Sequence, residues 1–101
     1  MSLAKLKLVF LPQAREDFVG IMQYTEMHWG RPQRDVYAQL LNRHLLLLRE
    51  FPESGQLQPA LGESIRLKRA GRHLVVYIIS ADTIFILRIV HESMSINRQV
   101  I

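Results

Sequence analysis

The segment from Ser64 to His91 reads SIRLKRAGRHLVVYIISADTIFILRIVH and decides the expected fold. Two nearly continuous apolar runs, LVVYII and IFILRIV, indicate central strands that are covered on both faces for much of their length. The turn sequences Ala-Gly-Arg at 70–72 and Ala-Asp-Thr at 81–83 separate strands expected over 65–69, 73–80 and 84–90. In the first strand, alternation predicts that Ile65 and Leu67 face inward and that Arg66 and Lys68 face outward.

The chain before this segment predicts one strand and two helices. Residues 4–10 alternate, with lysines on the polar side, as expected of a half-buried edge strand. Pro12 is expected to open a helix that ends near Gly30, and a second helix is expected from about residue 32 to 51, stopped by Pro52. Gly20 is a weak position within the first helix and would let another backbone come close. Residues 52–63 show no periodicity and are expected to form a loop.

The predicted order is therefore β-α-α-β-β-β in one domain spanning residues 1–101. Because so few residues separate the helices, we expect them to pack as an antiparallel hairpin. The expected class is α+β, with an antiparallel sheet packed against this hairpin. The second apolar face of the sheet would be covered by the C-terminal tail or by another chain. The leucine run at 45–48 cannot face inward as a whole, and this indicates an exposed apolar strip at a partner interface.

Composition restricts the possible functions. The net charge of +4 and the pI near 10.0 favour an anionic partner. There is no cysteine, so disulfides and thiolate metal sites are excluded, and the chain suits a reducing cytoplasm. No apolar run is long enough to span a membrane. The four histidines lack i, i+4 pairing and carboxylates at ligand spacing, so we expect no metal site and no cofactor.

The sheet segment concentrates basic side chains, which makes it the candidate site. Arg66 and Arg88 could form an anion site, since guanidinium groups grip phosphate or carboxylate with forked donors. The alternative is a structural role in ion pairs with Asp82 or Glu63. The basic residues of the segment, against the single acid Asp82, are Arg66, Lys68, Arg69, Arg72 and Arg88.

Two further groups of residues are candidates for a functional or a packing role. His91 could act as a general acid or base in RNA cleavage, with possible help from His73 and Tyr77, because an imidazole titrates near neutrality. Its alternative role is packing or hydrogen bonding at a strand end. Trp29 and Tyr24 are expected to form a packed corner of the helical hairpin rather than a platform for a ligand.

The order and spacing of several short motifs resemble the ParE branch of the ParE/RelE toxins, which belong to bacterial type II toxin–antitoxin pairs. The resemblance covers essentially the whole chain. The alanine of the usual A-x-x-Y pattern in the second helix does not match. The matching positions are Ala14, Asp17 and Phe18, then Tyr24, Trp29-Gly30, Tyr37, Phe51 to Gly55, Arg66, Gly71, His73, Val75 to Tyr77, and Ile86 to His91.

This resemblance implies a toxin that inhibits DNA gyrase and is neutralised by a cognate antitoxin in a hetero-oligomer, with nucleic acid bound only through the antitoxin. Two alternatives remain open: a RelE-like, ribosome-dependent mRNA endoribonuclease acting through Arg66, Arg88 and His91, and a non-toxic member that retains only antitoxin binding. Ser93 and Ser95 stand where the family often has Arg and Asp, which leaves the toxicity of this chain open. The residues expected to bind the target or antitoxin are Arg66, Lys68, Arg69, Arg72, Arg88, His91 and Met94.

Overall fold

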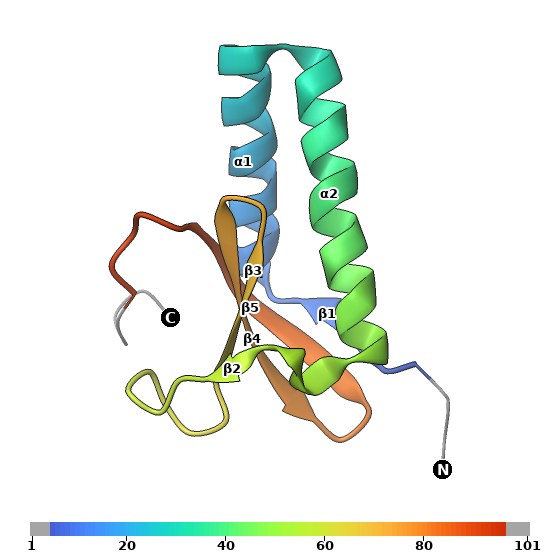
Figure 1. The fold of residues 1–101 in the computed structure, drawn as a ribbon, viewed down its shortest axis with the longest axis vertical. Helices are drawn as coiled ribbons and strands as arrows, with labels where there is room; N and C mark the ends of the chain where they lie inside the picture. The colour runs from blue at the N-terminus through green and yellow to red at the C-terminus, as the bar shows by residue number, and fades with distance from the viewer. Residues whose placement is uncertain (1–4, 97–101) are drawn as a thin grey trace.

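A helical hairpin packs against a five-stranded sheet in the computed structural model, which describes residues 5–96 (Figure 1). The two helices stand side by side and extend beyond the sheet at one end. No helix in the described part is long and apolar enough to cross a membrane. The elements in chain order are β1 (Lys7–Phe10), α1 (Pro12–Trp29), α2 (Arg31–Glu50), the 3-10 helix η1 (Pro52–Ser54), β2 (Gln56–Leu57), β3 (Arg66–Ala70), β4 (His73–Ser80) and β5 (Thr83–His91).

The sheet has the strand order β1-β5-β4-β3-β2, and the α+β fold predicted from the sequence is confirmed. Strands β3, β4 and β5 form the expected antiparallel meander. Strand β1 pairs in parallel with β5, so the sheet as a whole is mixed. The two residues of β2 were not predicted, because so short a segment has no periodicity of its own and exists only by pairing with Arg66 and Leu67.

The helix boundaries follow the proline and glycine positions in the sequence. Pro12 is the first residue of α1, where its missing N–H group costs no hydrogen bond. Gly30 alone links the helices and has a φ of 88°, in the left-handed region that favours glycine. The predicted edge position of the first strand is confirmed, and Lys7 on its exposed side pairs with Asp82 at 3.5 Å.

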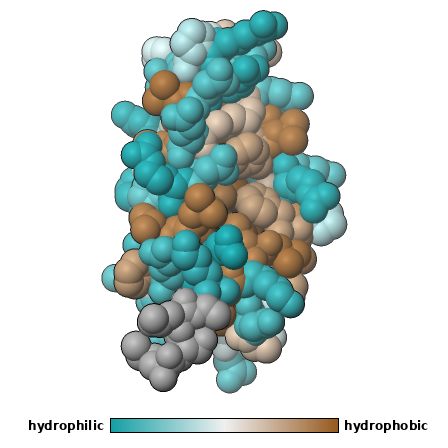
Figure 2. All heavy atoms as spheres, turned by 90° about the vertical axis from the view of Figure 1, so that its right-hand side faces the viewer, coloured by the Kyte–Doolittle hydropathy of each residue, from teal (hydrophilic) through white to brown (hydrophobic). Residues whose placement is uncertain are grey.

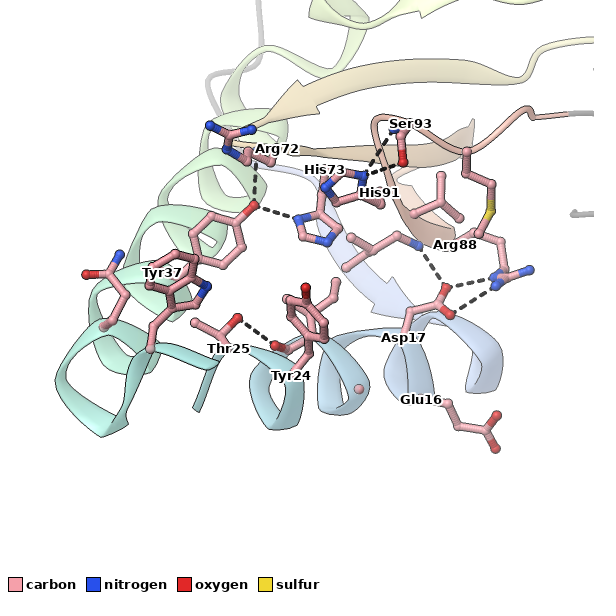
Figure 3. Close-up of a pocket in the computed structure, with 17 residues that line it drawn as sticks. Glu16, Asp17, Tyr24, Thr25, Tyr37, Arg72, His73, Arg88, His91 and Ser93 are labelled. Atoms are coloured by element: carbon pink, nitrogen blue, oxygen red, sulfur yellow. Dashed lines mark hydrogen bonds and ion pairs between the residues drawn. The ribbon is translucent and has the colours of Figure 1, made fainter. Parts of the chain in front are cut away.

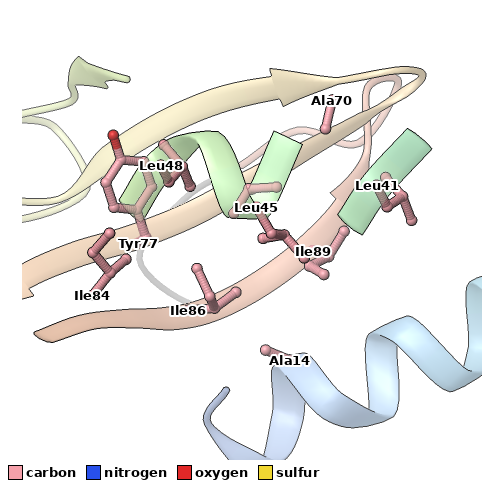
Figure 4. Packing of buried hydrophobic residues seen from close by; sticks show 10 residues of the cluster. Ala14, Leu41, Leu45, Leu48, Ala70, Tyr77, Ile84, Ile86 and Ile89 are labelled. Atoms are coloured by element: carbon pink, nitrogen blue, oxygen red, sulfur yellow. The ribbon is translucent and has the colours of Figure 1, made fainter. Parts of the chain in front are cut away.

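The hydrophobic core lies between the sheet and the hairpin. Leu45 and Leu48 of the leucine run are buried, whereas Leu46 and Leu47 are 55% and 46% exposed, so the run does not face inward as a whole. Figure 4 shows the leucines of α2 lying over the apolar side chains of β4 and β5. The buried cluster consists of Ala14, Leu41, Leu45, Leu48, Ala70, Val75, Tyr77, Ile84, Ile86 and Ile89.

The predicted facing of β3 is wrong. Arg66 pairs with Tyr77 and Lys68 pairs with Val75, and cross-strand partners share one face of a sheet. Both partners are buried in the core, so Arg66 and Lys68 lie on the helix side of the sheet. The reason is that β3 lies near a sheet edge, where a long basic side chain can reach past the core to polar groups.

The expectation that Gly20 admits a neighbouring backbone is also wrong. Gly20 is exposed, and among residues 5–96 no neighbouring segment would lie within 4 Å of a Cβ atom built there. The close approaches occur instead at Gly55 and Gly71. A Cβ atom at these positions would meet the hydroxyl oxygens of Tyr77 and Tyr37 at 2.5 and 2.9 Å.

Candidate binding cleft

A cleft of about 1250 Å³ opens between α1 and the far ends of β4 and β5 (Figure 3). The register of the meander explains its position. His73 at the start of β4 pairs with His91 at the end of β5, on the same face as the core residues Val75 and Ile89. At this end of the sheet the apolar layer therefore gives way to two imidazole rings beneath the helical hairpin. Their centroids are 5.4 Å apart in an edge-to-face arrangement.

Tyr37 of α2 fixes the orientation of His73. The Tyr37 hydroxyl accepts a hydrogen bond from the Arg72 backbone N–H at 3.0 Å and lies 2.5 Å from His73 Nδ1. The phenol has one proton, and in the described part of the chain His73 Nδ1 is the acceptor recorded for it. Burial lowers the pKa of His73, and the proximity of His91 lowers it further. Burial also raises the pKa of Tyr37. His73 is therefore held as a neutral ring.

At the other end of the cleft, Asp17 of α1 is fully engaged by β5. One carboxylate oxygen accepts from Arg88 Nε at 2.7 Å and from the Ile89 backbone N–H at 2.9 Å, and the other accepts from Arg88 Nη2 at 3.0 Å. The hydrogen bonds to Asp17 raise the pKa of Arg88. The pairing of β1 with β5 ends at Ile86. Beyond that point the Asp17 carboxylate accepts the hydrogen bond of the Ile89 N–H on the same edge of β5. The pair fastens α1 to the sheet and cancels the charge at this end.

The structure brings together only part of the predicted site. Arg72, Arg88, His91 and Met94 all line the cleft. Arg69 is instead paired with Glu92 at 2.7 Å, on the face of the sheet opposite the hairpin.

Arg66 lies away from the cleft, near η1. Its guanidinium donates to the backbone oxygens of Glu53 and Gly55 at 3.2 and 2.8 Å. The predicted pairing of Arg66 and Arg88 with Asp82 or Glu63 is wrong, since Arg66 binds carbonyl groups and Arg88 binds Asp17. The set Arg66, Arg88 and His91 is thus not assembled around one point.

Three aromatic residues of the cleft differ from what local sequence patterns predict. Trp29 and Tyr24 are 71% and 62% exposed, so the predicted packed corner is wrong. The tip of the hairpin extends beyond the sheet, and nothing in the described part of the chain covers these rings. Tyr24 stacks on His28 with a centroid distance of 4.0 Å. Tyr37 was identified only through the family motif, because its partner His73 lies 36 positions away in the sequence.

Tyr77, a candidate for assisting catalysis, has a structural role instead. Its side chain is 0% exposed, its hydroxyl donates to the Pro52 carbonyl at 2.7 Å, and it accepts from the Gly55 N–H at 2.9 Å. Burial raises the pKa of Tyr77. Among the described residues, no group of three His, Cys, Asp or Glu side chains could hold a metal ion.

Known structures share this architecture. The chain superimposes on the chromosomal ParDE TA system from P. aeruginosa with a TM-score of 0.75 and 17% identity, over 86% of this chain and 96% of the other. It superimposes on the toxin–antitoxin complex RelBE2 from Mycobacterium tuberculosis with a TM-score of 0.64 and 22% identity, over 92% and 98% of the chains. A helical hairpin on a mixed sheet of this kind is the fold of the ParE/RelE toxins.

Sequence comparison identifies the branch. The family model of the ParE toxin of the type II toxin–antitoxin system, parDE, matches residues 8–96. Toxin ParE1 of Caulobacter vibrioides is 31% identical over 83 residues, which cover 82% of this chain and 85% of that protein. The chain belongs to the ParE toxin family, and it is a toxin of the type II toxin–antitoxin class.

Proposed function

We propose that this toxin acts by binding DNA gyrase, and that a cognate antitoxin neutralises it in the cytoplasm. The observation that carries this proposal is that Arg66, Arg88 and His91, the candidate residues for RNA cleavage, do not surround one point. Arg66 is held by two backbone carbonyls near η1, whereas Arg88 is held by Asp17 of α1 in a cleft that Arg66 does not line. A phosphodiester cleavage site needs its cations and its acid or base at one point. The arrangement therefore favours a binding protein over a ribonuclease.

The surface beside α2 and β3 supports an antitoxin partner. Val36, Leu40 and Leu47 recur at helical spacing on one side of α2. Leu40 reaches the turn at Gly71, so this side borders the edge of β3. Val36 and Leu47 are 56% and 46% exposed, and Figure 2 shows hydrophobic side chains gathered across the middle of the face that carries α2. An amphipathic helix can lay its apolar side on such a strip.

The edge of β3 offers a second mode of binding. β2 pairs only with Arg66 and Leu67, so no described strand lies beside Lys68 to Ala70 on that side. An extended segment can add to such an edge through main-chain hydrogen bonds. Lys68 and Arg69 would favour an acidic segment at this place. A chain that places a helix on α2 and a strand on β3 would cover both features.

Gyrase supercoiling and translating ribosomes provide the decisive assays. The purified chain should inhibit supercoiling by gyrase and leave ribosome-bound mRNA uncut. Codon-positioned cuts that disappear in His91→Ala would overturn the gyrase proposal in favour of the ribonuclease. Normal growth at a high level of the folded chain, without its antitoxin, would favour the non-toxic alternative.

The antitoxin surface can be tested with two adjacent leucines. We expect Leu47→Asp to abolish co-purification with the protein encoded by the neighbouring reading frame. Leu46→Asp is the matched control, because Leu46 has similar exposure but lies about 100° away around the helix. Equal loss of binding in both variants would contradict the placement of the antitoxin on this strip.

A further inference from the structure

Each histidine of the cleft has one ring nitrogen engaged as a hydrogen-bond acceptor and the other left to donate. The Ser93 backbone N–H donates to His91 Nδ1 at 3.1 Å, so this nitrogen is an acceptor. The Tyr37 hydroxyl fixes His73 Nδ1 as an acceptor in the same way. A neutral imidazole with an accepting Nδ1 carries its proton on Nε2. Both rings therefore have an Nε2–H group left to donate, in two side chains that line one cleft.

Among the charged side chains around these donors, Arg72 is the cation that can bind a ligand. Asp17 is paired with Arg88 and Glu92 with Arg69, and the nearby Arg72 and His91 also lower the pKa of Glu92. Within the described residues, the Arg72 guanidinium forms no hydrogen bond or ion pair, although its backbone N–H is bound to Tyr37. Glu16 also borders the cleft, and in Figure 3 it points away from the histidines. An anionic group is thus favoured at the end of the cleft where Arg72, His73 and His91 meet.

Aromatic surface lies beside this donor cluster. Trp29 and Tyr24, both largely exposed, line the same cleft from α1. Flat rings of this kind stack on nucleobases with little regard to sequence. A carboxylate on a protein segment would use the donors and leave the aromatic surface uncovered. A ligand that joins a planar ring to a phosphate uses both.

We propose that this cleft binds the phosphate of a nucleotide. The phosphate accepts hydrogen bonds from Arg72 and from the Nε2–H groups of His73 and His91, and the base stacks against Trp29 or Tyr24. Tyr37 is a positioning residue, since its hydroxyl binds His73 Nδ1 and thereby leaves the proton of the ring on Nε2. The source of the phosphate is a free mononucleotide or a nucleic-acid strand, and either supplies the same chemistry. This inference does not depend on gyrase or on the antitoxin.

Trp29 supplies the measurement, because it is the single tryptophan of the chain and lies in the cleft. Adenosine 5′-monophosphate should quench its fluorescence saturably at concentrations below about 10 mM, the weak end of specific binding. Adenosine alone should bind at least about tenfold more weakly, since it lacks the charge-assisted bonds. Inorganic phosphate should displace the nucleotide. A phosphorylated tetraribonucleotide identifies a strand as the source if it binds more tightly, and a mononucleotide if it does not.

Two arginine variants distinguish specific binding in the cleft from general attraction of the nucleotide to a basic protein. Arg72→Ala should weaken binding of adenosine 5′-monophosphate by about tenfold or more, whereas Arg43→Ala, at an exposed position of α2, removes the same charge and should leave it unchanged. Circular dichroism and the midpoint of thermal unfolding verify that both variants fold. His73→Gln keeps a donor near the Nε2 position and should retain more affinity than His73→Ala. The proposal is overturned by absence of saturable quenching, by equal binding of adenosine, or by equal effects of the two arginine variants.

Discussion

Tyr77 and Tyr37 are held by the same device at two places in the molecule. Each hydroxyl accepts a hydrogen bond from a backbone N–H, of Gly55 and Arg72 respectively, at 2.9 and 3.0 Å. Each also lies against a glycine, Gly55 or Gly71, whose missing Cβ atom makes room for it. In both cases a tyrosine joins an element of the main fold to the backbone of a loop or turn.

The two tyrosines differ in what receives their proton. Tyr77 donates to the Pro52 carbonyl, which does not titrate, and its side chain is completely buried. Tyr37 donates to an imidazole, His73, whose second nitrogen belongs to an open cleft. The first arrangement can only stabilise the fold. The hydrogen bond of Tyr37 orients His73, a side chain that a ligand can contact. The same local geometry therefore stabilises the fold at Tyr77 and orients a binding group at Tyr37.

The largest effect should come from filling the space beside Tyr77. Gly55→Ala places a methyl group 2.5 Å from the Tyr77 hydroxyl oxygen and 2.9 Å from the Leu67 carbonyl oxygen. We expect a loss of about 3 kcal/mol in the free energy of unfolding, because a buried backbone oxygen cannot yield as a flexible side chain could. Urea denaturation measures it. A loss below about 0.5 kcal/mol would contradict this account of Gly55.

The two tyrosines themselves give the direct comparison. Tyr77→Phe leaves the buried Gly55 N–H and Pro52 carbonyl without their partner, and we expect it to cost about 2 kcal/mol. Tyr37→Phe should cost about 1 kcal/mol or less, because water can reach the groups that it leaves at the cleft.

The tyrosine variants also separate stability from recognition. In nitrogen-15 NMR spectra, Tyr37→Phe should change the tautomer populations of His73, whereas Tyr77→Phe should leave them unchanged. An unaltered His73 spectrum in Tyr37→Phe would mean that the phenol does not set the tautomer.

A stabilising change is available on the wall of the cleft. Gly20→Ala should raise the free energy of unfolding by about 0.5–1 kcal/mol, since alanine is favoured over glycine within a helix and the added methyl group meets no neighbour. The midpoint of thermal unfolding should therefore rise in Gly20→Ala and fall in Gly55→Ala. Destabilisation by Gly20→Ala would show that the glycine is needed for a contact outside the described chain.

The smallest effect concerns pH. The folded protein lowers the pKa of His73, so this ring binds protons less readily when folded than when unfolded. As pH falls through the unfolded pKa near 6.5, the unfolded state takes up more protons and stability decreases. His73→Gln should make the free energy of unfolding less dependent on pH between about 5 and 7. An identical slope in this variant would assign the pH dependence to other groups.

Local patterns were sufficient for most of the fold. Proline and glycine positions placed both helices within about a residue of their observed ends, and the apolar runs placed the meander. The facing of β3 failed because alternation gives two faces without saying which one meets the helices. Only the pairing of Arg66 with Tyr77 decides that, and it depends on the register across a turn.

The candidate site was less accessible to such reasoning. Arg72, Arg88, His91 and Met94 were identified from charge and family pattern, and all four line the cleft. The exposure of Trp29 could not be read from the sequence, because the same helical spacing serves a packed corner and a protruding tip.

The amino-acid sequence by itself determined the order of the elements, the edge strand with its lysines, the basic character of the sheet and membership in the ParE toxin family. The elements, the edge strand and the basic charge follow from short-range periodicity, turn chemistry and composition, which act over a few residues. Family membership follows from similarity spread over residues 8–96. Only the tertiary structure decided that Asp17 neutralises Arg88, that Tyr37 orients His73, and that Arg66 is held by backbone carbonyls. Each of these contacts joins side chains from separate elements, and its existence depends on the register of the sheet and on the placement of the hairpin over it.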